Sequence, residues 1–166
     1  MLNLISLITA IFTALVPLSP FLVDGPSMLP TLNDGDLFIL DSRAYASAEP
    51  QRGDIVVFSD EKDPDYYYVK RIVGLPGERL HVTQDGIYVE DKGVKEDLPE
   101  PYLAHAAGDK NYAMDGYEDE VFAVPGDKYF VLGDNRSHSL DSRSFAYPFI
   151  PKTLIKGKYL FTLIDL

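Results

Sequence analysis

Three short segments of the 166-residue chain contain hydroxyl, amine and carboxylate groups in patterns that could serve catalysis. In VDGPSMLPTL at 23–32, Ser27 stands among Gly and Pro turn residues, and in YVKRIVGLPGE at 68–78, Lys70 lies within an apolar run. The third segment, VLGDNRSHSLDSR at 131–143, places a dense group of hydroxyl, carboxylate and guanidinium side chains after a predicted strand. These residue types suit nucleophilic catalysis by a serine.

Each segment also has an ordinary structural interpretation. A serine in a Gly/Pro loop is usually a turn residue, and a lysine within a strand often protects an exposed sheet edge. The polar segment 131–143 is either a solvated loop or the hydrogen-bonded side of an active site. Strand alternation puts Lys70 on the face opposite Val69 and Arg71, so one of the two adjacent bases should point inward or toward a cleft.

A serine hydroxyl is a poor nucleophile until a neighbouring base takes its proton. A lysine can do this only when neutral, which requires burial to lower its pKa from ~10.4 toward ~8. Tyr68, Val69 and Met28 are expected to supply the apolar surroundings of Lys70. A rival arrangement is a Ser27, His138, Asp141 triad, although alternation turns His138 away from the side on which Ser139 lies.

Metal, cofactor and nucleic-acid chemistry have little support in the composition. The chain has no cysteine, and its three histidines, His81, His105 and His138, lack ligand spacing. The net charge of -11 repels a phosphate backbone. We therefore expect no metal, no cofactor and no nucleic-acid partner.

The elements that must position these groups are mostly strands. Twelve Gly and 12 Pro are spread along the chain, which favours many turns between short strands in one mainly β domain. Strand composition occurs at 36–41, 53–58, 66–74, 86–90, 127–133 and 158–164, with a hairpin turn expected at Asp85-Gly86. Residues 91–120 contain nine acids and three bases, and we expect them to form an exposed acidic excursion.

The amino-terminal segment has no charged side chain before Asp24. The stretch MLNLISLITAIFTALV could form an apolar helix of about 24 Å before Pro17, with the following LSPFLV completing a membrane span. A cleaved secretory signal or a buried helix are the alternatives, but the segment lacks a basic start and is apolar on all faces. We expect a membrane anchor at 1–22 and a β catalytic domain at 23–166; no basic residue precedes the anchor to set its orientation.

In chain order, the three polar segments and RGDIVVF at 52–58 resemble the sequence boxes of type I signal peptidases. This resemblance implies antiparallel β-sheets, a Ser/Lys dyad acting through an acyl-enzyme, and removal of signal peptides from exported preproteins. It also implies a single-pass protein of the cell membrane, in contact with lipid, with its catalytic domain on the extracytoplasmic face.

By position, the resemblance gives each polar residue a role. Ser27 matches the nucleophile, Lys70 the general base, Ser139 the hydroxyl that orients the lysine, and Asp141 with Arg143 a supporting ion pair. The backbone N–H of Ser27 is expected as one oxyanion donor. Some members have a second donor on a serine where this chain has Gly25.

The same resemblance implies that the substrate binds as an added strand with small side chains at the first and third positions before the cut. The matching substrate-binding positions are Val23, Asp24, Gly25, Met28, Leu32, Tyr68 and Val69. A self-cleaving repressor-type Ser/Lys protease and a non-enzymatic membrane-tethered β module are the alternative functions.

Overall fold

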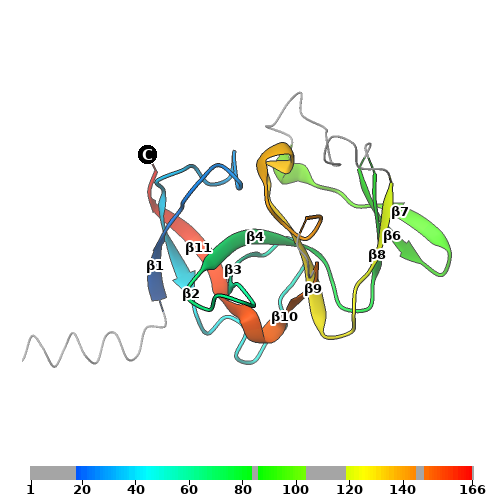
Figure 1. The fold of residues 1–166 in the computed structure, drawn as a ribbon, viewed down its shortest axis with the longest axis horizontal. Helices are drawn as coiled ribbons and strands as arrows, with labels where there is room; N and C mark the ends of the chain where they lie inside the picture. Colours follow the sequence, from blue (N-terminus) through cyan, green and yellow to red (C-terminus); the bar gives the residue numbers. More distant parts are fainter. Residues whose placement is uncertain (1–17, 84–85, 104–118, 145–147, 166) are drawn as a thin grey trace, which may run out of the picture.

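The computed structural model describes residues 18–83, 86–103, 119–144 and 148–165, in which eleven strands form two antiparallel sheets (Figure 1). The seven-stranded sheet has the order β1 (Leu18–Leu22), β2 (Leu37–Asp41), β11 (Ile155–Ile164), β3 (Ile55–Ser59), β4 (Tyr67–Gly74), β9 (Lys128–Leu132), β10 (Ile150–Pro151). The four-stranded sheet has the order β7 (Val94–Asp97), β6 (Ile87–Asp91), β5 (Arg79–Val82), β8 (Glu120–Ala123). The mainly β, antiparallel class expected from the sequence is confirmed.

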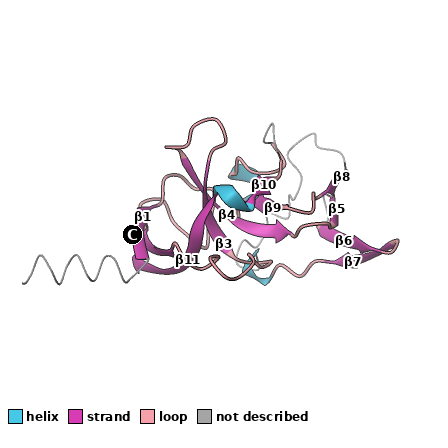
Figure 2. Cartoon of the chain, turned by 90° about the horizontal axis from the view of Figure 1, so that it is seen from below, coloured by secondary structure: helices cyan, strands magenta, loops and turns pink. Residues whose placement is uncertain are grey.

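Helical structure in the described part of the chain is limited to three short 3-10 turns, η1 (Pro101–Leu103), η2 (Arg136–His138) and η3 (Lys152–Leu154). The second sheet projects from the end of the molecule opposite β1 (Figure 2). No helix among these residues is long and apolar enough to cross a bilayer. The proposed anchor helix falls in residues 1–17 and lies outside the described residues.

Residues 18–22, which we assigned to the end of the anchor, form strand β1 instead. β1 pairs along its whole length with β2, so that Leu18 lies opposite Asp41 and Leu22 opposite Leu37. The exposure of β1 alternates from residue to residue, as in a strand with one face toward the core. Phe21 packs against the core from one face of β1, whereas Leu18 and Leu22 on the other face are exposed.

The six strands predicted from sequence are all present, with ends shifted by a few residues. β3 is buried throughout because cores pack on both of its faces. Val57 belongs to the core under the β1–β2 loop, whereas Val56 and Phe58 belong to the core on the opposite face. β3 in turn pairs along its whole length with the neighbouring strand β4.

A third core joins the two sheets. It contains Val73 from β4, Leu80 from β5, and Phe122 and Phe130 from β8 and β9. The chain passes between the sheets at Gly74, where an added Cβ would come within 2.8 Å of Phe130 Cβ. Glycine therefore permits the close approach of the two layers at this point.

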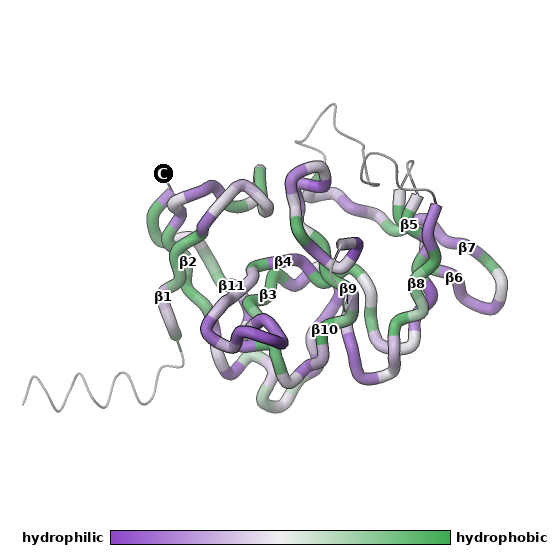
Figure 3. The backbone as a smooth tube through the Cα atoms, in the orientation of Figure 1, coloured by the Kyte–Doolittle hydropathy of each residue, from purple (hydrophilic) through white to green (hydrophobic). Residues whose placement is uncertain are grey.

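The acidic excursion is only partly exposed, contrary to our expectation. β7 is solvent-exposed throughout, and the β6–β7 hairpin is mostly hydrophilic (Figure 3). Beyond it the chain turns back to the first sheet, where the Glu100 side chain is only 4% exposed against Arg136. A carboxylate can be buried here because a buried guanidinium pairs with it. Residues 104–118 of the excursion, and Asp85 of the expected hairpin turn, lie outside the described residues.

Candidate active site

Ser27 lies in the loop that joins β1 to β2, and buried neighbours hold that loop. Met28 and Leu32 are fully buried beneath it, and the N–H groups of Thr31 and Leu32 donate to the Met28 carbonyl at 2.9 and 3.0 Å. Val23 N donates to Asp36 O at 2.9 Å at the start of the loop. The tight turn leaves the half-buried Ser27 side chain facing Lys70.

Lys70 lies on β4 opposite Val56 of β3 and is only 3% exposed. Its Nζ donates to Ser27 Oγ at 2.8 Å and to the Val69 carbonyl at 2.8 Å. Forty-three positions along the chain separate the amine from the hydroxyl. The fold thus brings the nucleophile candidate and the base candidate into direct contact.

Burial lowers the pKa of Lys70 from its ordinary value of 10.5 to about 8. Desolvation disfavours the ammonium form, whereas the nearby carboxylates of Asp141 and Asp134 act in the opposite direction. Desolvation wins because Asp134 and Asp141 are each paired with an arginine. A substantial neutral fraction of Lys70 exists near pH 8, and a neutral amine can accept the serine proton.

The ion pair expected between Asp141 and Arg143 is present and fully buried. Arg143 Nε and Nη2 each donate to the Asp141 carboxylate at 2.9 Å, and both side chains have 0% exposure. Asp141 Oδ2 also accepts the Gly133 N–H at 3.1 Å. The pair therefore fixes the turn that follows β9 beside the Ser27 loop.

Ser139 lies next to this pair but makes no hydrogen bond to Lys70. Its Oγ is buried and has no hydrogen-bond partner within the described residues. A Cβ at Gly133 would overlap Ser139 Oγ and the Ser27 carbonyl oxygen, so the three residues are closely packed. The orienting contact expected for Ser139 is not formed in this structure, although its hydroxyl and the Ser27 carbonyl oxygen both pack against Gly133.

A groove of about 250 Å³ opens over the Ser27–Lys70 pair. Four of the predicted substrate-binding residues line it, namely Asp24, Gly25, Tyr68 and Val69. The other three, Val23, Met28 and Leu32, lie in the core beneath the groove because their side chains are almost completely buried. Sequence reasoning missed the lining residues Phe21, Leu22, Phe38, Val57, Tyr66, Tyr67 and Leu140.

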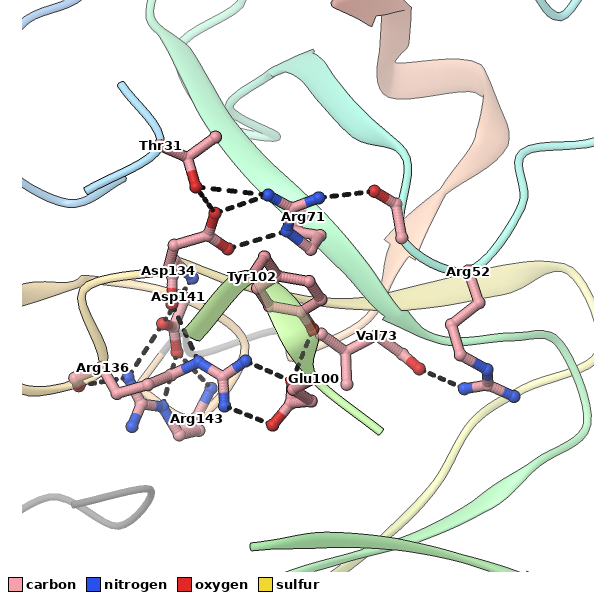
Figure 4. Close-up of polar contacts among 12 residues, drawn as sticks. Thr31, Arg52, Arg71, Val73, Glu100, Tyr102, Asp134, Arg136, Asp141 and Arg143 are labelled. Atoms are coloured by element: carbon pink, nitrogen blue, oxygen red, sulfur yellow. Dashed lines mark hydrogen bonds and ion pairs between the residues drawn. The ribbon is translucent and has the colours of Figure 1, made fainter. Parts of the chain in front are cut away.

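Sequence reasoning also missed a second buried ion pair beside the dyad. Arg71 Nε and Nη2 donate to Asp134 at 2.8 and 2.6 Å, and Thr31 Oγ1 donates to the same carboxylate at 2.5 Å (Figure 4). Thr31 belongs to the Ser27 loop, Arg71 follows Lys70, and Asp134 follows β9. Strand alternation predicts that one of the adjacent bases Lys70 and Arg71 points inward. Both side chains are in fact buried, so the apolar surroundings of Arg71 were a signal for a buried partner.

The rival triad is not assembled. His138 is exposed, and its Nδ1 lies 2.8 Å from Ser137 Oγ, not near Ser27. Asp141 bonds Arg143 instead of a histidine.

The backbone amide of Gly25 already has an acceptor, because its N–H donates to Asp34 Oδ1 at 2.8 Å. No group of three His, Asp or Glu side chains that could hold a metal occurs in the described part of the chain.

A buried lysine bonded to a serine hydroxyl, in an antiparallel β protein, is the arrangement that a serine hydrolase with a lysine base would need. Comparisons with known proteins narrow this class. The family model described as "Signal peptidase, peptidase S26" matches residues 1–164. The chain belongs to this family and is a serine endopeptidase.

Individual relatives agree with the family match. The chain is 39% identical over 145 residues to a signal peptidase I of Bacillus amyloliquefaciens, covering 85% of this chain and 74% of the relative. It is 40% identical over 151 residues to signal peptidase I U of Bacillus subtilis strain 168, covering 86% and 75%. A crystal structure of a signal peptidase I from Enterococcus faecalis V583 superposes with a TM-score of 0.53 at 34% identity, over 69% of this chain and 98% of the other. The resemblance seen in the sequence is confirmed, and the alternatives of a repressor-type protease and a non-enzymatic module are wrong.

Proposed function

We propose that this chain removes signal peptides from exported preproteins by a Ser27/Lys70 dyad. The observation on which the proposal rests is the 2.8 Å contact between Lys70 Nζ and Ser27 Oγ, in a site that lowers the pKa of the lysine to about 8. The match to signal peptidases over most of the chain supplies the substrate class.

In the acylation step, neutral Lys70 takes the Ser27 proton while Oγ attacks the scissile carbonyl carbon. The resulting ammonium then gives its proton to the leaving amine as the C–N bond breaks, which leaves the signal peptide as an acyl ester on Ser27. In the second half, Lys70 takes a proton from water, whose oxygen attacks the ester. Ser27 Oγ leaves and regains a proton from Lys70, so the enzyme is unchanged.

The dimensions of the groove suit an extended peptide with small side chains near the cut. Strand β1 and the start of β4 flank it, and an extended chain between them could add as a strand. Phe21 and Phe38 stack with ring centroids 5.9 Å apart, and Phe21 meets Tyr67 edge-on at 5.9 Å. These rings line the groove, so a bulky side chain that reached them would have to displace them.

We place the enzyme at the cell membrane, with the catalytic domain on the extracytoplasmic face where exported preproteins arrive. An apolar surface on the outer face of β1, β2 and β11 supports lipid contact. Leu37 of β2 lies between Leu22 of β1 and Ile164 of β11, so the three side chains share one face. The large exposed apolar residues of β1 and β11 are Leu18, Leu22, Leu160, Phe161, Leu163 and Ile164. Residues 1–17, in which we propose a membrane anchor, directly precede β1 in the sequence.

The test is cleavage of a preprotein with an Ala-x-Ala site by the full chain in lipid. We expect Ser27→Ala and Lys70→Ala to abolish cleavage and His138→Ala to leave it unchanged. A reagent that acylates reactive serines should label the wild type and should label Lys70→Ala very little. Cleavage at the same site by Ser27→Ala would disprove the proposed nucleophile.

A further inference from the structure

The end of the acidic excursion returns to the catalytic centre and packs against it. Residues 100–103, here called the strap, follow the exposed strand β7 and include the 3-10 turn η1. The strap contributes two side chains, Glu100 and Tyr102, to the interior of the molecule, and each contacts a buried arginine (Figure 4). Neither side chain lines the substrate groove.

Glu100 forms a two-pronged ion pair with Arg136. Arg136 Nη1 donates to Oε2 at 3.1 Å, Nη2 donates to Oε1, and the two side chains are 4% and 2% exposed. The Tyr102 hydroxyl donates to Glu100 Oε1 at 2.5 Å. Such a buried pair is strongly directional, and removing one partner leaves the other charge unpaired.

Arg136 in turn holds the turn after β9. Its Nε donates to the Gly133 carbonyl at 3.0 Å, and its own carbonyl accepts Arg143 Nη2 at 2.6 Å. Within the same turn, Asn135 N donates to the Ser27 carbonyl at 3.1 Å and Asn135 Nδ2 donates to the Pro26 carbonyl at 3.0 Å. Hydrogen bonds, together with the backbone of the turn, therefore connect Glu100 to the backbone of the nucleophile.

Tyr102 provides the second connection. Its ring lies over the guanidinium of Arg71, with Arg71 Cζ 3.9 Å from the ring centroid. Arg71 follows Lys70 in β4 and pairs with Asp134 of the same turn. Burial, then the neighbouring Glu100 carboxylate, raises the pKa of Tyr102, so its hydroxyl remains a donor over the working pH range. The ring thus covers one side of the Arg71–Asp134 pair and limits its access to water.

We propose that Glu100 and Tyr102 are positioning residues for catalysis, and that docking of the strap on Arg136 and Arg71 holds Ser27 within reach of Lys70. This inference rests on the proposed Ser27/Lys70 mechanism. The three buried arginines Arg71, Arg136 and Arg143 are matched by Asp134, Glu100 and Asp141, so the strap supplies the third of three anions in the network. Without Glu100, the buried guanidinium of Arg136 beside the catalytic turn loses its two-pronged carboxylate.

The test compares Glu100→Gln with Glu96→Gln in steady-state cleavage of a peptide substrate. Glu96 lies on exposed β7, and its replacement changes the net charge of the excursion equally. We expect Glu100→Gln to lower kcat about 10- to 100-fold with KM within about twofold, because the reacting atoms are misplaced while the groove is intact. Glu96→Gln should match the wild type. Wild-type kcat for Glu100→Gln, at a temperature where circular dichroism shows it folded, would overturn the proposal.

Three further measurements separate positioning from a general loss of stability. Tyr102→Phe keeps the ring over Arg71 and should retain most activity, whereas Tyr102→Leu should lose about tenfold or more in kcat.

If Glu100 acts through Arg136, the double variant Glu100→Gln/Arg136→Gln should be no slower than Arg136→Gln alone. The pH midpoint of kcat/KM should stay near that of the wild type, because Lys70 remains buried. Additive losses in the double variant, or equal activity of the Phe and Leu variants, would contradict the proposal. Inactivity of the wild type itself would instead count against the dyad mechanism.

Discussion

Lys70 Nζ lies 2.8 Å from Ser27 Oγ inside a site where the lysine is 3% exposed. The contact between these two atoms and the burial of the lysine each serve the proposed reaction. Contact gives the amine access to the serine proton, and burial lowers the lysine pKa to about 8, so that a usable fraction of the amine is neutral.

The first prediction concerns the pH dependence of cleavage. In the proposed mechanism only neutral Lys70 accepts the serine proton, so kcat/KM should rise about tenfold per pH unit below pH 8 and level off above it. His138→Ala should leave the midpoint in place. A midpoint that moves or disappears in His138→Ala would indicate a histidine base instead.

The second prediction concerns stability. The folded pKa of Lys70 lies below the unfolded value of about 10.5, so its effect on folding is most favourable above pH 10.5 and is lost as pH falls through about 8. Below pH 8 the fold contains a buried ammonium, at a cost of about 3 kcal/mol. Lys70→Met should therefore unfold at higher denaturant concentration than the wild type at pH 7, and the difference should shrink toward pH 10.5. A constant difference across this window would show that the lysine does not titrate as described.

A third prediction concerns the close packing at Gly133. A Cβ there would overlap the Ser27 carbonyl oxygen, which is backbone and cannot swing away, and would lie 2.5 Å from Ser139 Cβ. Gly133→Ala should lower the free energy of unfolding by about 1–3 kcal/mol and reduce cleavage at least tenfold. Gly126→Ala is the matched control, because no atom lies within 4 Å of its added Cβ. Chemical denaturation and kcat/KM of the two variants provide the measurement.

The fourth prediction separates activity from stability at Ser139. Its buried hydroxyl has no hydrogen-bond partner within the described residues, so Ser139→Ala should leave the free energy of unfolding unchanged or slightly higher. If the hydroxyl rotates toward Lys70 during turnover, the same change should lower kcat about tenfold. Unchanged kcat in Ser139→Ala would show that the proposed orienting role is absent.

A fifth prediction concerns the apolar outer face of β11. Phe161 and Ile164 are 49% and 46% exposed, so serine at both positions should alter stability little. Sedimentation with lipid vesicles should show weaker binding of Phe161→Ser/Ile164→Ser, and lipid should stimulate its turnover less. The matched control is Val94→Ser on exposed β7, which should bind vesicles like the wild type.

Local patterns in the sequence were sufficient for part of the fold. The six predicted strands have alternating or continuous apolar residues between Gly and Pro turns, which is a local signal. The missed strands β5, β7, β8 and β10 are two to four residues long, too short for such a pattern. β1 was misread because LSPFL has the composition of the apolar segment before it, and only its pairing with β2 shows that it belongs to the sheet.

The order of the segments around Ser27, Lys70 and Ser139 matches one family, so residue types and order are enough to propose the groups that react. How those groups are held depends on contacts between distant parts of the chain. Met28 and Leu32 prove to be core residues below the groove, while Phe21 and Tyr67 line it. The buried partners Glu100 and Arg136 are 36 positions apart, and no local pattern predicts that two such charges will meet. Their pairing depends on the path of the whole chain, since burial of each charge is tolerated only where the fold delivers the other.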